Sequence, residues 1–377
     1  MNIPESTIHH LIDSLTQSER SFALYRLPWT DEPILVLQEK GKPETTETLC
    51  DLNGKEGFII SPFKPSATHP IVIIRPDKVA HNWNMITDAL KEVQEGIQSE
   101  KQAEASSECT ARTSQHTNDE NEKRKYTETF NLFIEPLRKK EFRKLVLSRH
   151  SRQLLPEKFS PLNAFIKACN SYPRMMISLC HTPVSGTWIG STPEIILGGN
   201  GSNWHTVALA GTMQMDGENM PTEWDKKNQE EQEFVSEYIR KTVKKFGSRL
   251  TEKGPYTARA GQLVHLKTDF HFTLKDTRHL GNILQELHPT PAVCGLPKEE
   301  AYRFIIDTEN YDRSYYSGII GWLAPEGDTT LYVNLRCMRI GKDTATLYAG
   351  GGILPTSEAE SEWEETQHKM DTMRNIL

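Results

Sequence analysis

The stretch MMISLCHTPVSGTWIGSTPEIILGGNGSNWHTVALAGTM, residues 175–213, decides the class of fold. It holds three strand-like runs, MMISLCH, TWIGSTPEIILGG and TVALAGTM, separated by turns that contain Gly or Pro. Strands that follow one another through short turns pair antiparallel, because a parallel pair needs a long crossover connection. The stretch therefore predicts part of an antiparallel sheet.

The same strand-and-turn pattern continues on both sides. Before it, KLVLSRHSRQL at 144–154 predicts a strand, and SPLNAFIKACNSY predicts a helix that begins at Ser160 and Pro161. After it, apolar residues recur every three to four positions within 222–246, which predicts a long helix. A loop should follow. The remaining expected elements are the strands QLVHLKTDFHFTL, SGIIGWLA, TTLYVNLRCMRI and TATLYAGGGIL, with helices near 278–288, near 298–307 and from about Glu358.

The N-terminal part carries weaker signals of the same kind. MNIPESTIHHLIDSL predicts a capped amphipathic helix, and residues 20–86 contain the short strand-like runs FALYRL, PILVLQE, GFIISPF and IVIIRP. Residues 92–127 hold almost no large apolar side chains and are expected to form a mobile polar insertion. We therefore expect an α+β protein with large, mainly antiparallel sheets, in which 1–91 is a strand-rich part of the fold and 128–377 is its core.

Charge and composition exclude several classes of partner. Lys and Arg number 44 against 51 Asp and Glu, which gives a net charge of −7 and argues against non-specific nucleic-acid binding. No window approaches the roughly 18 apolar residues of a membrane span, and the N-terminus is not a signal-peptide pattern, so we expect no membrane partner and a cytoplasmic location. The 6 cysteines form no close pairs, which is typical of reduced thiols.

Two predicted helices present oxygen-bearing side chains at a spacing of three. They are Asn228 with Glu231, and Glu362 with Glu365. Residues at i and i+3 share a helix face, so two such faces could hold a hard cation such as Mg²⁺, which prefers carboxylates and water. The competing interpretation is a pair of solvated glutamate-rich faces, which are common.

Two further features could carry chemistry. Lys144 begins a strand and Glu194 lies in the turn STPE; a buried lysine can act as a base and a buried glutamate as an acid, although their spacing does not place them together. The glycine-containing runs at 209–212 and 350–352, with Arg336 on a preceding strand, could bind a carboxylate. Neither run is a phosphate loop, and glycine-rich hairpin ends are usually plain turns.

An ordered set of motifs across about residues 125–377 gives these features a common interpretation. KLVLSR, STPE, LAGT, KNQEEQ, VHLKT, HPTPAVCG, ENYDRSYYSGIIGW, VNLRC, YAGGGI and SEWEETQHK occur in this order. Together they resemble the chorismate-utilising enzymes, a group that contains isochorismate, salicylate, anthranilate and aminodeoxychorismate synthases. The resemblance implies one large domain of two antiparallel sheets sandwiched together, with helices outside and a central cleft for chorismate and Mg²⁺.

The resemblance also assigns metal-binding residues. Glu231 and Glu362 match the family's magnesium ligands, with Glu365 and Asn228 at positions that hold metal-bound water. Relatives often carry an acid at position 228 and a histidine at 232, so Asn228 and Gln232 depart from the pattern. Magnesium would bind the ring carboxylate of chorismate and help the C4 hydroxyl to leave.

The substrate residues follow from the same motifs. Those implied to surround the pyruvyl carboxylate or the ring are Gly211, Thr212, His265, Ala292, Tyr316, Leu335, Arg336, Gly350, Gly351, Gly352 and Lys369. The positive charges of Mg²⁺, Arg336, Lys144 and Lys369 predict a locally positive cleft in an acidic protein.

The branch of the family depends on the nucleophile. Members that add water at C2 carry a lysine at position 144 as base, and Glu194 would protonate the departing hydroxyl. Ala210 replaces the lysine that attacks covalently in aminodeoxychorismate synthases, so that route is closed. Ala292 stands where salicylate-forming relatives tend to carry a hydroxyl, which favours isochorismate as the product, of a menaquinone or siderophore route. A salicylate synthase and a non-catalytic chorismate-binding protein are the alternatives, and relatives of this size imply a monomer.

Overall fold

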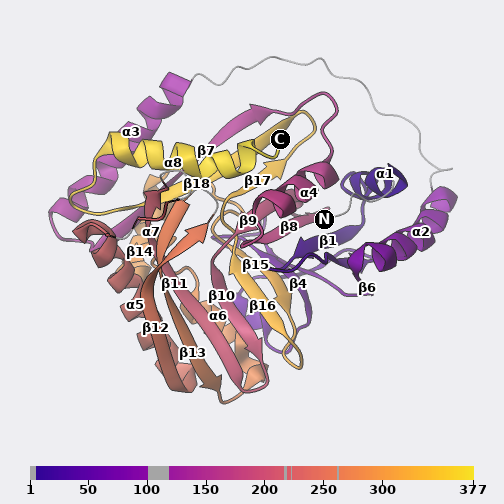
Figure 1. The fold of residues 1–377 in the computed structure, drawn as a ribbon, viewed down its shortest axis with the longest axis horizontal. Helices are drawn as coiled ribbons and strands as arrows, with labels where there is room; N and C mark the ends of the chain where they lie inside the picture. Colours follow the sequence, from indigo (N-terminus) through magenta and orange to yellow (C-terminus); the bar gives the residue numbers. More distant parts are fainter. Residues whose placement is uncertain (1–5, 101–118, 216–218, 222, 261–262) are drawn as a thin grey trace.

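Two large antiparallel sheets form the centre of the computed structural model, which describes residues 6–100, 119–215, 219–221, 223–260 and 263–377 (Figure 1). In order across the first sheet, the strands are β14 (Gly295–Leu296), β7 (Lys144–Leu154), β18 (Thr344–Ile353), β17 (Cys337–Ile340), β9 (Gly186–Thr192), β8 (Met176–Thr182), β1 (Ser21–Arg26), β2 (Ile34–Gln38) and β6 (Lys78–His81). Those of the second sheet are β12 (Gly247–Ala260), β13 (Leu263–Leu274), β11 (Asn203–Gln214), β10 (Ile195–Asn200), β16 (Thr329–Val333), β15 (Ile319–Leu323), β4 (Gly57–Ser61), β5 (Ile71–Ile74) and β3 (Glu44–Thr46).

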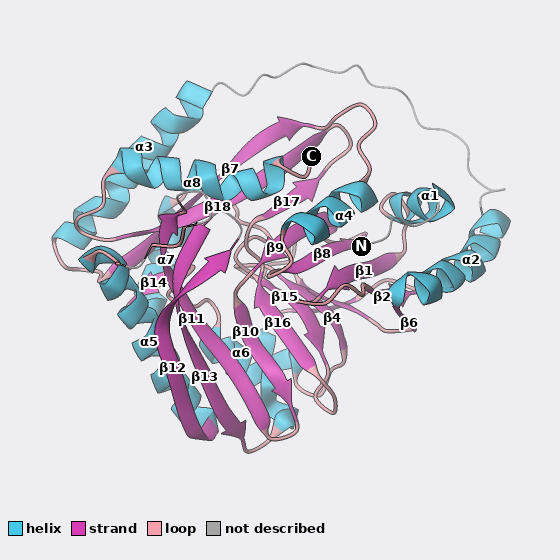
Figure 2. Cartoon of the chain, viewed as in Figure 1, coloured by secondary structure: helices cyan, strands magenta, loops and turns pink. Residues whose placement is uncertain are grey.

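Helices flank the strands (Figure 2). The described helices are α1 (Ser6–Leu15), α2 (Asn82–Glu100), α3 (Asp119–Arg138), α4 (Pro161–Ser171), α5 (Lys226–Phe246), α6 (Leu280–Leu287), α7 (Lys298–Thr308) and α8 (Ala359–Arg374), with 3₁₀ turns at Leu49–Leu52 and Thr277–His279. None of them is long and apolar enough to cross a membrane.

Strand β1 shows why the sheets are sandwiched. All six of its residues are buried, because alternate side chains serve two different interfaces. Phe22 and Leu24 join the cluster under the helices, whereas Ala23 and Tyr25 join a cluster with Phe58 of the second sheet. The first sheet therefore lies between a helical layer and the second sheet, and the predicted two-sheet fold is confirmed.

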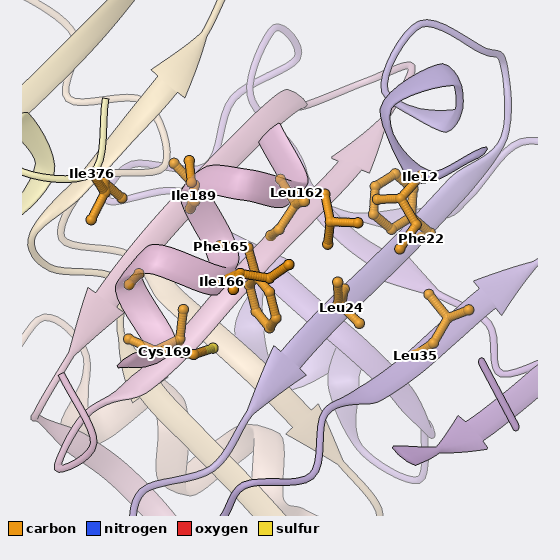
Figure 3. Packing of buried hydrophobic residues seen from close by; sticks show 14 of the residues in the cluster. Ile12, Phe22, Leu24, Leu35, Leu162, Phe165, Ile166, Cys169, Ile189 and Ile376 are labelled. Atoms are coloured by element: carbon orange, nitrogen blue, oxygen red, sulfur yellow. The ribbon is translucent and has the colours of Figure 1, made fainter. Parts of the chain in front are cut away.

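The helical layer over the first sheet is built from apolar faces of α1 and α4. Ile12 of α1 and Leu162 and Phe165 of α4 pack on Phe22 and Leu24 (Figure 3). Helix α4 begins as the sequence predicts, because the Ser160 side chain accepts a hydrogen bond from the Asn163 amide and Pro161 occupies the first turn.

Helix α5 covers the second sheet and carries part of the predicted site. Its apolar residues Val235, Ile239 and Val243 are buried against that sheet. The side chain of Asp225 caps the helix by accepting a hydrogen bond from the amide of Asn228. The first two turns of α5, which contain residues 228–232, are thereby fixed beside β11.

The structure differs from the sequence-based expectation at several places. TWIGSTPEIILGG and TTLYVNLRCMRI, each expected as one strand, are split into β9 with β10 and β16 with β17, and the two halves of each run lie in different sheets. Residues 247–260, expected as a loop, form the edge strand β12; most of its side chains are exposed, so it lacks an alternating apolar pattern. The short strands β3 and β6 were not predicted. The flanks of the predicted insertion, 92–100 and 119–127, lie in α2 and α3, while 101–118 lie outside the described residues. In α3, burial of Tyr126 ties the chain to Trp363, with ring centroids 5.5 Å apart.

Candidate active site

A cavity lies where β11, β13 and β18 approach the turns before β10 and β17. It is lined by every predicted substrate residue: Gly211, Thr212, His265, Ala292, Tyr316, Leu335, Arg336, Gly350, Gly351, Gly352 and Lys369. Glu194 and Glu231 also line it, whereas Lys144, Asn228, Glu362 and Glu365 are not among the lining residues. Residues more than 150 positions apart in the sequence thus meet at one place.

Glu194 is a buried carboxyl group in the cavity wall. It is 3% exposed, and its Oε1 accepts a hydrogen bond from the Thr290 hydroxyl at 3.3 Å. Burial raises the pKa of Glu194 to about 7, although the charge of Lys144 and the Thr290 hydrogen bond oppose this shift. A carboxyl group with this pKa can carry and release a proton near neutral pH.

Lys144 is fully buried at the start of β7 and pairs with Glu231, which lines the cavity. Its Nζ lies 2.9 Å from Oε1 of Glu231. The backbone of β18 comes close to this pair, since a Cβ added at Gly352 would lie 2.3 Å from Glu231 Oε1 and 2.9 Å from Lys144 Cε. Glycine at position 352 is therefore required for the lysine and the glutamate to meet beside the strand.

Glu362 and Glu365 lie on α8, and each forms an ion pair with a different lysine. Lys227 Nζ donates to Glu362 Oε1 at 2.5 Å, and Lys369 Nζ donates to Glu365 Oε1 at 2.7 Å. Burial and the neighbouring Glu365 raise the pKa of Glu362. Burial opposes ionisation of Glu365 too, but Lys369, together with Lys227 and Thr212, outweighs it and lowers the pKa of Glu365.

Arg336 and His265 form the cationic side of the cavity. Arg336 has a φ of 46°, a left-handed conformation that is uncommon for a residue with a side chain. Its guanidinium donates to the Ala260 carbonyl at 2.9 Å and to Nε2 of His265. Because Nε2 accepts, Nδ1 of His265 carries the hydrogen and donates to the Gly211 carbonyl at 2.8 Å. Burial and the charge of Arg336 lower the pKa of His265, which keeps the ring neutral.

The two residues that depart from the family pattern have defined contacts. Asn228 Oδ1 accepts from the Thr212 amide at 2.9 Å, and its Nδ2 donates to Asp225 at 2.7 Å. Gln232 Oε1 accepts from the Ala210 amide, and its Nε2 donates to the Ala208 carbonyl and the Thr268 hydroxyl. Both side chains thus bind backbone groups near the end of β11. The placement of Asn228 near a metal stays a prediction.

The carboxylates have the chemistry of a magnesium site. Glu362 is 1% exposed and its Oε2 has no hydrogen-bond partner, so a buried anionic oxygen is available there. A Cβ at Gly351 would lie 3.2 Å from that oxygen, so glycine gives it free space on the strand side. Among the described residues no three His, Cys, Asp or Glu side chains already form a metal-binding cluster. Magnesium is commonly held by one or two carboxylates with water and substrate oxygens, so Glu362 has suitable ligand chemistry, and its pairing with Glu231 around a metal stays a prediction.

Two contact residues escaped the sequence analysis. Thr290 lies within the quoted motif HPTPAVCG but its contact with Glu194 joins positions 96 residues apart. Lys227 precedes Asn228 and looked like one of many surface lysines, whereas its partner Glu362 is 135 residues away. The available sequence signal for Lys227 was its position directly before Asn228, which is a predicted metal-site residue.

Comparison with known proteins supports the assignment of the fold and the motifs. The sequence profile of the family described as "Chorismate binding enzyme" matches residues 64–377. The chain belongs to this family.

Two curated proteins are similar to parts of the chain. Isochorismate synthase EntC of Escherichia coli K12 is 29% identical over 207 residues, which are 52% of this chain and 53% of that protein. The salicylate biosynthesis isochorismate synthase of Pseudomonas aeruginosa is 32% identical over 198 residues, 50% of this chain and 42% of that protein. The aligned region thus spans about half the length of these curated relatives or less.

The whole fold of this chain superposes on almost all of a solved structure. The structure of MenF, the menaquinone-specific isochorismate synthase from Escherichia coli, superposes with a TM-score of 0.77 at 21% identity. The superposition covers 100% of this chain and 92% of that one. At this identity the likeness concerns the fold.

Proposed function

We propose that this protein is an isochorismate synthase, which converts chorismate to isochorismate in a magnesium-dependent reaction. The observation that carries the proposal is the cavity wall: Glu194, whose pKa is about 7, lines the same cavity as Glu231, which pairs with Lys144. An acid and a base near one cavity are what the exchange of a hydroxyl group for water requires. The names of the relatives favour the same activity.

The proposed reaction balances with one water consumed and one released. Lys144 takes a proton from the water that forms the new bond at C2, the ring double bond shifts, and Glu194 gives its proton to the C4 oxygen, which leaves as water. Arg336, with the neutral His265 held against it, and Lys369 would bind the carboxylates of the dianion. Magnesium held by Glu231 and Glu362 would supply charge neutralisation at the ring carboxylate.

Product analysis tests this function. Purified protein is incubated with chorismate and MgCl₂ at neutral pH, and the products are separated chromatographically. Isochorismate as the main product is expected. Salicylate with pyruvate would assign the protein to the lyase alternative, and chorismate binding without turnover in excess Mg²⁺ would leave a non-catalytic binding protein. Anthranilate formed with ammonia or glutamine would overturn water as the nucleophile.

Lys144→Ala tests the assignment of the base. Because the variant keeps the cavity cations but loses the group that accepts the proton, we expect turnover to fall at least about 10³-fold, with chorismate binding kept within about threefold. Lys158→Ala, at an exposed position after β7, is the matched control and should keep full activity. Retained turnover in Lys144→Ala at saturating Mg²⁺ would exclude this lysine as the base.

A further inference from the structure

Lys227 stands out because it holds one oxygen of a buried carboxylate and leaves the other without a partner. Its Nζ lies 2.5 Å from Glu362 Oε1, while Glu362 Oε2 is buried with no hydrogen-bond partner. Glu362 is 1% exposed, so water is a poor substitute for either contact. An anionic oxygen in this condition needs a second cation or donor.

The surrounding charges indicate where that cation belongs. The other two glutamates predicted for the metal site, Glu231 and Glu365, each have a lysine partner of their own. Lys369 Nζ lies 2.7 Å from Glu365 Oε1, and Lys144 Nζ lies 2.9 Å from Glu231 Oε1. Within the described part of the chain, Glu362 Oε2 is thus the oxygen of this group that is both buried and unpaired.

We propose that Lys227 is a positioning residue for the metal site: it fixes Glu362 through Oε1 so that Oε2 is presented to Mg²⁺. The inference rests on the proposed magnesium site and adds a residue to it that does not itself touch the metal. Residues that hold metal ligands by a hydrogen bond to the far atom commonly contribute about 10–100-fold in metal affinity.

The sign of the effect distinguishes positioning from simple charge. If Lys227 acted only as a nearby positive charge, its removal would strengthen Mg²⁺ binding, because two cations repel. If it competed with the metal for Glu362, removal would also strengthen binding. Positioning predicts the opposite, since Glu362 without its partner on Oε1 loses its fixed orientation and no longer presents Oε2 to the metal.

The experiment measures binding of MgCl₂ to the full-length protein by isothermal titration calorimetry at pH 8 without chorismate. Lys227→Met should raise the dissociation constant about 10–100-fold. Lys227→Arg keeps a charged donor and should remain within about threefold of the unmodified protein. Lys226→Met is the matched control, because that neighbouring side chain is 90% exposed and pairs with Glu230, and it should leave the constant unchanged or lower it slightly.

A second readout is the upward shift of the melting temperature on adding MgCl₂, which should shrink in Lys227→Met and persist in Lys226→Met. If Lys227→Met does not fold, Lys227→Gln replaces it, with an expected loss of at least about fivefold. If Lys227→Met or Lys227→Gln binds Mg²⁺ as tightly as the unmodified protein or more tightly, the inference is overturned while the magnesium site stays intact. Absence of Mg²⁺ binding by the unmodified protein, together with metal-independent turnover, would overturn the magnesium site and the inference with it.

Discussion

At the scale of single residues, burial and neighbouring contacts change the pKa of side chains in the site. Glu194 is an unremarkable glutamate in the sequence, and burial raises its pKa to about 7. The hydrogen bond from Thr290 works against that shift, because it stabilises the ionised form. Burial, opposed by the charge of Lys144 and by this hydrogen bond, sets the pH range in which the carboxyl group carries a proton.

Thr290→Val should move the pH dependence of activity. Glu194 acts in its protonated form, so kcat/KM falls as pH rises through about 7. Loss of the hydroxyl removes a contact that lowers the pKa of Glu194, so this alkaline limb should shift upward by about 0.5–1 pH unit. The measurement is the pH profile of kcat/KM for chorismate.

Thr206→Val is the control for that measurement. Thr206 is equally buried, but its hydroxyl donates to the Ile196 carbonyl, so the limb should stay in place. An alkaline limb that stays fixed or moves downward in Thr290→Val would contradict the role given to Thr290.

At the scale of secondary-structure elements, helices are recognisable from the sequence when their apolar face meets a sheet. Helix α4 illustrates this, with a cap, a proline in its first turn and a buried face that includes Phe165. Strand β12 illustrates the opposite case. It is an edge strand whose side chains are mostly exposed, so its pairing with β13 left no apolar pattern in residues 247–260.

Phe165→Ala tests the packing of α4 on the first sheet. The ring is fully buried under the helix, so its loss should leave a cavity and cost about 3–5 kcal/mol of unfolding free energy. Asn163→Ala changes an exposed side chain of the same helix and should alter stability by less than about 0.5 kcal/mol. Urea denaturation followed by circular dichroism measures both; similar losses in the two variants would show that helix propensity, and not packing, sets the value.

At the scale of the whole molecule, a buried ion pair connects separate walls of the cavity. Arg313 binds Glu309 through two nitrogens, at 2.6 and 2.7 Å. The same guanidinium donates at 2.8 Å to the carbonyl of Val146 on β7 and at 2.8 Å to that of Val293, next to Ala292. The strand that begins at Lys144 is thus tied to the loop that contains Thr290.

Arg313→Met should therefore destabilise the whole protein. It leaves the Glu309 carboxylate buried without its partner, at a cost of about 3–5 kcal/mol, and should lower the melting temperature. Arg278→Met breaks an exposed pair with Asp276 and should leave the melting temperature unchanged, because water replaces the lost contact. Equal melting temperatures for the two variants would mean that the buried pair contributes nothing to stability.

The sequence by itself determined the antiparallel α+β class, most helices and strands, and the residues of the cavity wall from Gly211 to Lys369. The class and the elements follow from local periodicity and turn residues, which are properties of neighbouring positions, whereas the cavity-wall residues were implied by the resemblance of the ordered motifs to the chorismate-utilising enzymes. Tertiary structure alone decided that Lys144 meets Glu231, that Thr290 meets Glu194, and that Lys227 holds Glu362. Those pairs join distant parts of the chain, so their contacts, and the burial that sets the pKa of Glu194, arise when sheets and helices pack together.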